Sequence, residues 1–203
     1  MPPRPPAYTR LDVDERRRRL LDLGTDLFAR FSYDELSMAR IAREAGISKA
    51  LLYHYFPGKQ AYFAAALEDK AAELAALTAP DPSRSPLEQL TGALDAFLGW
   101  VDANAAAYAK LVRSAAAIAE VREIVDRVRD DTAERILAGL SGDAAAPRPA
   151  LRTSVRAWLW FMDGAILDWV EHRDLSREEL RGLLLGTLLG AVTAAGEPGA
   201  LGS

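Results

Sequence analysis

The chain has 203 residues, half of them hydrophobic, and a formal net charge of −4 at neutral pH. It contains no cysteine, which excludes disulfides and thiolate chemistry, and its first residues lack the apolar segment of a signal peptide. The longest uncharged stretch, residues 182–196, is too short and too rich in glycine for a membrane span, so we expect a soluble, cytoplasmic protein.

Alanine and leucine are abundant and runs of β-branched residues are scarce, which favours an all-α fold. Charge is unevenly distributed along the chain. Residues 1–60 hold 11 Lys/Arg and 8 Asp/Glu, a net +3, whereas residues 61–203 hold 14 and 21, a net −7. A basic amino-terminal segment followed by an acidic remainder is compatible with an amino-terminal segment that approaches phosphate groups.

Residues 1–11 are rich in proline and are predicted to form a disordered arm. Asp12 and Glu15 form a possible capping pair for a first helix that runs to about Arg30. Four arginines, residues 16–19, fall in its first turns, where cations face the unfavourable end of the helix dipole. Two explanations stay open, a contact with phosphate and an ordinary solvated patch.

Residues 37–58 predict two short helices joined by a tight turn. Ser37 is placed to cap a helix over residues 38–45, and Gly46 suits the left-handed residue that ends it. Ser48 is placed to cap a third helix over residues 49–56, which Pro57-Gly58 ends. Apolar residues hold the pair at an angle, which is the pattern of a helix-turn-helix whose second helix enters the major groove of DNA.

The remaining sequence predicts six more helices, which give about nine in all. They cover approximately residues 59–77, 87–101, 108–115, 121–140, 149–172 and a last helix capped by Ser176 with Glu179. We therefore predict a DNA-binding domain over residues 12–58, a ligand-binding and dimerisation domain over 59–196, and a flexible tail over 197–203.

The last two helices carry more apolar surface than one core needs. Helix 149–172 is apolar nearly all round, and glycines recur every fourth residue in the helix that follows. Such a smooth stripe either packs tightly within the chain or forms a dimer interface. The predicted interface residues are Trp160, Gly164, Leu167, Gly182, Gly186 and Gly190.

The sequence offers little support for catalysis. It has no glycine-rich phosphate loop, no paired-histidine metal motif and no Gly-x-Ser-x-Gly elbow. We therefore expect no enzyme, no metal and no cofactor. Large apolar residues of the body either line a pocket for a hydrophobic organic effector or belong to the core. The candidate pocket residues are Trp100, Tyr108, Val112, Trp158, Phe161 and Met162.

Residues 41–59, Ile-Ala-Arg-Glu-Ala-Gly-Ile-Ser-Lys-Ala-Leu-Leu-Tyr-His-Tyr-Phe-Pro-Gly-Lys, resemble the TetR family of bacterial transcriptional repressors. The resemblance extends over about residues 12–75. It implies a nine-helix homodimer whose amino-terminal domain binds a palindromic double-stranded DNA operator and whose body holds a small-molecule pocket. Two positions depart from the family pattern, Leu51 in place of Thr or Ser, and Ala39 followed by the cation Arg40.

The front of the third helix carries cation, phenol and imidazole groups that suit phosphates and base edges. For Tyr53 or Tyr55 alone, half-buried packing is the alternative role. The candidate DNA-contacting residues are Ser37, Arg40, Ser48, Lys49, Ala50, Leu51, Tyr53, His54, Tyr55 and Lys59. The sequence thus predicts a ligand-responsive repressor; the alternative is a helical protein-interaction or lipophile-binding module without specific DNA binding.

Overall fold

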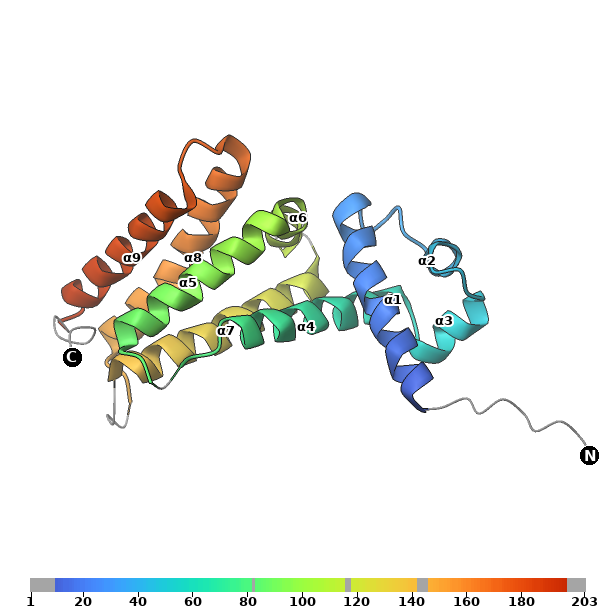
Figure 1. Cartoon of the computed structure of the whole chain (residues 1–203), viewed down its shortest axis with the longest axis horizontal. Coiled ribbons are helices and arrows are strands. Elements are labelled where there is room, and N and C mark those ends of the chain that lie inside the picture. The colour runs from blue at the N-terminus through green and yellow to red at the C-terminus, as the bar shows by residue number, and fades with distance from the viewer. Residues whose placement is uncertain (1–9, 82, 116–117, 142–145, 197–203) are drawn as a thin grey trace, which may run out of the picture. The chain divides into compact units, whose positions relative to one another are not determined.

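The computed structural model describes residues 10–81, 83–115, 118–141 and 146–196, and throughout these ranges its regular secondary structure is helical (Figure 1). The helices are α1 (Arg10–Arg30), α2 (Met38–Glu44), α3 (Lys49–Tyr55), α4 (Lys59–Leu77), α5 (Pro86–Ala103), α6 (Ala105–Ala115), α7 (Ala119–Ser141), α8 (Pro149–His172) and α9 (Arg177–Ala194). The predicted all-α class is confirmed.

The chain forms two compact units that divide after Lys70. The first unit contains α1, α2, α3 and the first part of α4. The predicted boundary at residue 58 lies too early, because the first turns of α4 bury Tyr62, Phe63 and Ala66. Those side chains belong to the core of the first unit, so α4 contributes to both units.

The core of the first unit combines aliphatic side chains with aromatic rings that contact one another. Tyr62 is fully buried, and its ring packs edge-on against Phe56 at 5.0 Å and against Phe63 at 5.5 Å between centroids. Its hydroxyl donates a hydrogen bond of 2.6 Å to the carbonyl of Leu20 in α1. Burial raises the pKa of Tyr62 above its ordinary value, so the hydroxyl stays a donor.

Helices α1 and α4 approach each other closely at Gly24. A Cβ atom at this position would lie 2.9 Å from the Cβ of Ala66 and 3.0 Å from the ring of Tyr62. These distances are shorter than ordinary van der Waals contact, so the position requires glycine. The contact fixes α1 against α4 at one point of the first unit.

The second unit is a bundle of the later helices in which α8 packs against both α7 and α9. Its core is mainly aliphatic and also contains Tyr108 and two tryptophans of α8. The indole N–H of Trp158 donates to the carbonyl of Leu184 at 2.9 Å, and that of Trp169 donates to the carbonyl of Leu175 at 2.8 Å. These bonds satisfy the polar atoms of both buried rings.

Ser176 and Glu179 form the complete capping box that was predicted at α9. Ser85 and Glu88 form another at α5, which was not predicted from the sequence. The predicted cap of the first helix is wrong. Helix α1 begins at Arg10, so Asp12 lies inside the helix. Residues 10 and 11 are thus helical, while residues 1–9 of the predicted arm and the predicted tail 197–203 lie outside the described residues.

No helix within the described ranges combines the length and the apolar character that crossing a bilayer requires.

Replacing Gly24 with Ala should destabilise the first unit, because the added methyl group would overlap the rigid Cβ of Ala66. We expect the free energy of unfolding to fall by about 1–3 kcal/mol. Urea denaturation followed by circular dichroism measures this change. Gly139→Ala is the matched control, since a Cβ there meets open space on α7 and should be neutral or slightly stabilising. Equal effects of the two substitutions would contradict the close-packing argument.

Candidate functional site

The helix-turn-helix is built from two serine caps and one left-handed glycine. The Ser37 hydroxyl accepts a hydrogen bond from the backbone N–H of Arg40 at 3.2 Å, and the Ser48 hydroxyl accepts one from that of Leu51 at 3.1 Å. Between them Gly46 has a φ of +65°, which L side chains rarely adopt. Both predicted DNA-contacting serines therefore have a structural task, and each keeps its hydroxyl proton as a donor.

Helix α3 has a buried back and an exposed front. Leu52 and Phe56, the residue that caps its carboxyl end, are inaccessible to solvent and join it to the core of the first unit. The side chains of Lys49, Tyr53 and His54 are exposed, as is Ala50, while Leu51 and Tyr55 are half-buried. The structure thus presents most of the predicted recognition residues on one open surface.

The side chains of two predicted DNA-contacting cations, Arg40 and Lys59, contact other residues of the first unit. The guanidinium of Arg40 stacks on the ring of Phe31, 3.9 Å from its centroid, and Nη1 donates to the carbonyl of Glu35. The Lys59 amino group donates to the carbonyl of Tyr33 at 2.8 Å and lies 4.0 Å from the centre of its ring. Both cations therefore fasten the segment that joins α1 to α2.

Arginines at the start of α1 lie close to the helix-turn-helix. The guanidinium of Arg17 is 5.6 Å from the centre of the Phe56 ring. Arg16 and Arg19 edge a hollow of about 330 Å³ whose remaining walls come from α1 and from the turn after α2. The run of arginines was visible in the sequence, but its position beside the turn and the end of α3 depends on how the helices pack.

Family models match most of the chain. The model of the bacterial regulatory proteins of the tetR family matches residues 20–66, and that of the tetracyclin repressor-like C-terminal domain matches residues 86–190. A solved tetR-family transcriptional regulator from Streptomyces coelicolor is 33% identical, with a TM-score of 0.78 over 93% of this chain and 86% of that chain. The chain belongs to the TetR family.

Curated relatives match over shorter stretches. The HTH-type transcriptional repressor KstR of Rhodococcus jostii is 32% identical over 76 residues, which are 37% of this chain and 36% of that protein. The HTH-type transcriptional activator FasR of Mycolicibacterium smegmatis is 31% identical over 104 residues, 49% of this chain and 46% of that protein. The chain therefore spans less than half the length of these relatives.

The predicted effector residues occupy the interior and one flank of the second unit. Tyr108 and Trp158 are buried in its core, and Trp100, Val112 and Met162 pack against that core. The sixth residue, Phe161, is 41% exposed. A hollow of about 570 Å³ in the same unit lies elsewhere and is lined by Asp95, Asp102, Arg177, Glu178 and Arg181.

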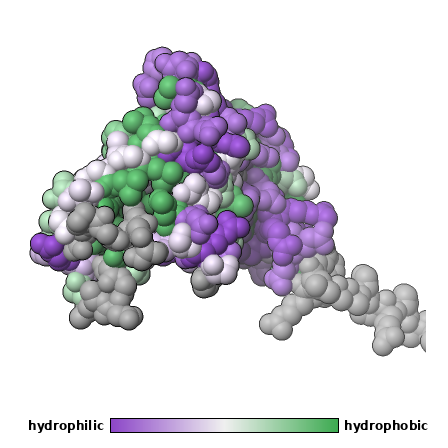
Figure 2. All heavy atoms as spheres, turned by 60° about the vertical axis from the view of Figure 1, so that its left-hand side comes forward, coloured by the Kyte–Doolittle hydropathy of each residue, from purple (hydrophilic) through white to green (hydrophobic). Residues whose placement is uncertain are grey.

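The predicted interface residues lie on one outer surface of α8 and α9. A Cβ atom built at Gly164, Gly182, Gly186 or Gly190 meets no atom of the described residues within 4 Å, which contradicts the alternative of tight packing within the described chain. Trp160 is 63% exposed and Leu167 is half-buried. Trp160, Phe161, Leu183 and Leu189 are exposed large hydrophobic residues of the same two helices. Figure 2 shows a hydrophobic area on the side of the molecule that it turns toward the viewer.

The placement of the cations predicts different effects for Lys49 and Arg40. Lys49→Ala should weaken operator binding by about 1–3 kcal/mol while leaving the fold intact, because its side chain is exposed on α3. Arg40→Ala should instead lower the free energy of unfolding by about 1 kcal/mol, because it removes the stacking on Phe31.

Fluorescence anisotropy with operator DNA and urea denaturation separate these two effects. Lys49→Ala serves as the control for stability, since its loss removes no contact with the core. If Arg40→Ala abolished DNA binding at unchanged stability, Arg40 would be a DNA contact after all.

Proposed function

We propose that the protein is a transcriptional repressor that binds a palindromic operator as a homodimer in the cytoplasm and is released by a small hydrophobic effector. The observation that carries the proposal is the exposed front of α3, where Lys49, Tyr53 and His54 stand on a helix whose back is buried. Donors fixed on a rigid helix are what recognition of a major groove requires. Its function is regulation rather than catalysis.

The open surface of α8 and α9 supports the homodimer. Four glycines with free space above them allow the backbone of another helix to approach closely, and exposed hydrophobic side chains border them. A two-fold pair of such surfaces would bury both sets of apolar groups. In such a dimer the two α3 helices would enter successive major grooves, about 34–36 Å apart.

Release by an effector requires that the ligand bind two states of the dimer unequally. The second unit offers large apolar residues around Tyr108, whose hydroxyl donates to Asp163 at 2.7 Å. Burial raises the pKa of Tyr108 well above its ordinary value, and the neighbouring Asp163 carboxylate raises it further. The hydroxyl therefore remains neutral, which suits a site for an apolar ligand with few polar groups.

Binding to DNA fragments that flank the gene of this protein tests the proposal. Fluorescence anisotropy at two salt concentrations, with unrelated DNA as the control, should show tight and selective binding that weakens steeply with salt. Binding that is weak, equal on both DNAs and lost at moderate salt would contradict a specific operator. It would favour the helical interaction module instead.

Gly186→Leu should dissociate the homodimer, because the larger side chain would occupy the free space that a partner helix needs. Sedimentation equilibrium of the full chain measures the dissociation constant of the dimer. Gly139→Leu is the matched control, since that glycine also lies exposed in a helix of the second unit but on α7. A Gly186→Leu variant that remains as dimeric as the control would place the interface elsewhere.

A further inference from the structure

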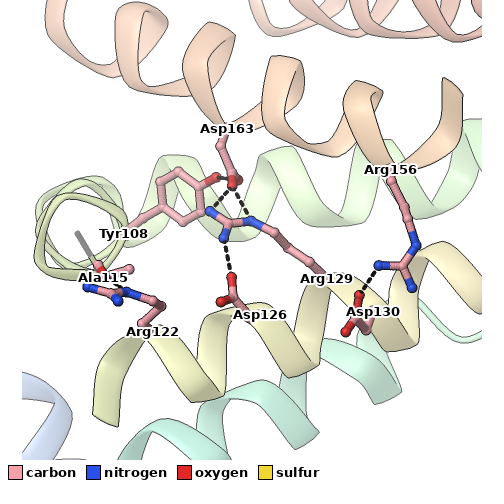
Figure 3. Close-up of polar contacts among 8 residues, drawn as sticks. All are labelled: Tyr108, Ala115, Arg122, Asp126, Arg129, Asp130, Arg156 and Asp163. Atoms are coloured by element: carbon pink, nitrogen blue, oxygen red, sulfur yellow. Dashed lines mark hydrogen bonds and ion pairs between the residues drawn. The ribbon is translucent and has the colours of Figure 1, made fainter. Parts of the chain in front are cut away.

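Arg129 of α7 is a largely buried cation held by two carboxylates (Figure 3). Its Nε and Nη2 atoms donate to one carboxylate oxygen of Asp163 at 2.9 and 2.6 Å, and Nη1 donates to Asp126 at 2.9 Å. The side chains of Arg129 and Asp163 are only 14% and 13% exposed. Three hydrogen bonds to two carboxylates leave the guanidinium little freedom to turn.

The fixed guanidinium lies against the ring of Trp160, 4.1 Å from its centre. Trp160 is nevertheless 63% exposed and belongs to the outer surface of α8, next to the open space above Gly164. The ring therefore has one contact with a buried, immobilised cation while much of its surface faces solvent. A preorganised tryptophan loses less freedom on association than a mobile one, which is a property of interface anchors.

We propose that Trp160 anchors the self-association surface and that Arg129 is its positioning residue, held from within the unit by Asp163 and Tyr108. The proposal rests on the homodimer proposed above and adds which side chain anchors it. Tyr108 donates to Oδ1 of Asp163, and Arg129 donates to Oδ2 of the same carboxylate. A ligand that displaces the Tyr108 hydroxyl thus changes the group that holds Arg129, and through it the Trp160 ring on the interface.

A second ion pair between the same two helices provides the control. Arg156 of α8 donates to Asp130 of α7 at 2.6 Å, and both side chains are about half exposed, at 48% and 54%. Figure 3 shows this pair on the same two helices as the Arg129 contacts. Breaking it removes a connection between α7 and α8 without disturbing the guanidinium that faces Trp160.

Sedimentation equilibrium of the full chain supplies the first test. Trp160→Leu should raise the dissociation constant of the dimer at least tenfold, and Arg129→Gln and Asp163→Asn should each raise it about three- to tenfold. In the Trp160→Leu background the same two substitutions should not raise the dissociation constant further, because they act by altering the position of the Trp160 ring. Asp130→Asn should leave the dissociation constant unchanged.

Fluorine NMR of protein labelled with 5-fluorotryptophan tests the positioning directly. The Trp160 resonance is assigned by its loss in Trp160→Phe. Tyr108→Phe, which removes one hydroxyl, and Asp163→Asn should both shift this resonance, whereas Asp130→Asn should not. The Tyr108→Phe variant keeps the test decisive if Arg129→Gln fails to fold.

The outcomes separate this proposal from the proposed function. A wild-type chain that stays monomeric overturns both the homodimer and the anchor. A dimer whose dissociation constant is indifferent to Trp160→Leu overturns the anchor alone. If Arg129→Gln weakens the dimer equally with and without Trp160, or if the Trp160 resonance does not respond to Asp163→Asn, Arg129 has a general structural role and its positioning role is wrong.

Discussion

The close packing of α1 against α4 is the constraint on which the candidate DNA-binding surface depends. Helix α3 has seven residues, too few to persist alone in water, so its position comes from what its back contacts. Phe56 at its end packs against Tyr62 of α4, and Tyr62 in turn donates to the carbonyl of Leu20 in α1. The absence of a side chain at Gly24 allows this arrangement, so a residue remote from the exposed front of α3 controls where that front lies.

Cations in the first unit have two distinct tasks. Arg40 and Lys59 each stack on an aromatic ring and donate to a backbone carbonyl, which fixes the segment between α1 and α2. Lys49 stands on the exposed front of α3, with its amino group 5.7 Å from the centre of the Tyr53 ring. An inward cation stabilises the scaffold and an outward one remains able to meet phosphate, so a count of basic residues overstates the number available to DNA.

The sequence predicts those features of the fold that depend on neighbouring residues. Serine caps, the left-handed Gly46 and the apolar face of α3 are local, and the structure confirms them. Contacts between distant segments had no such signal. The hydrogen bond from Lys59 to Tyr33 and the ion pair of Arg129 with Asp163 join residues far apart in the chain, and their partners are set by helix packing. The sequence therefore identified the charged residues of the candidate sites, but it did not indicate the direction in which each side chain points.

The outer surface of α8 and α9 makes two unfavourable contributions to the free energy of the isolated chain. An exposed glycine inside a helix costs about 1 kcal/mol relative to alanine, so Gly164, Gly182, Gly186 and Gly190 together cost roughly 4 kcal/mol. Among the residues that the structure describes, no close packing offsets this cost, because an added Cβ at each position would meet open space. Exposed Trp160 and Leu183 add an unfavourable hydration of apolar surface. In the proposed homodimer a second copy of the same surface would offset both costs, since the glycines permit close backbone approach and the apolar side chains would then be buried.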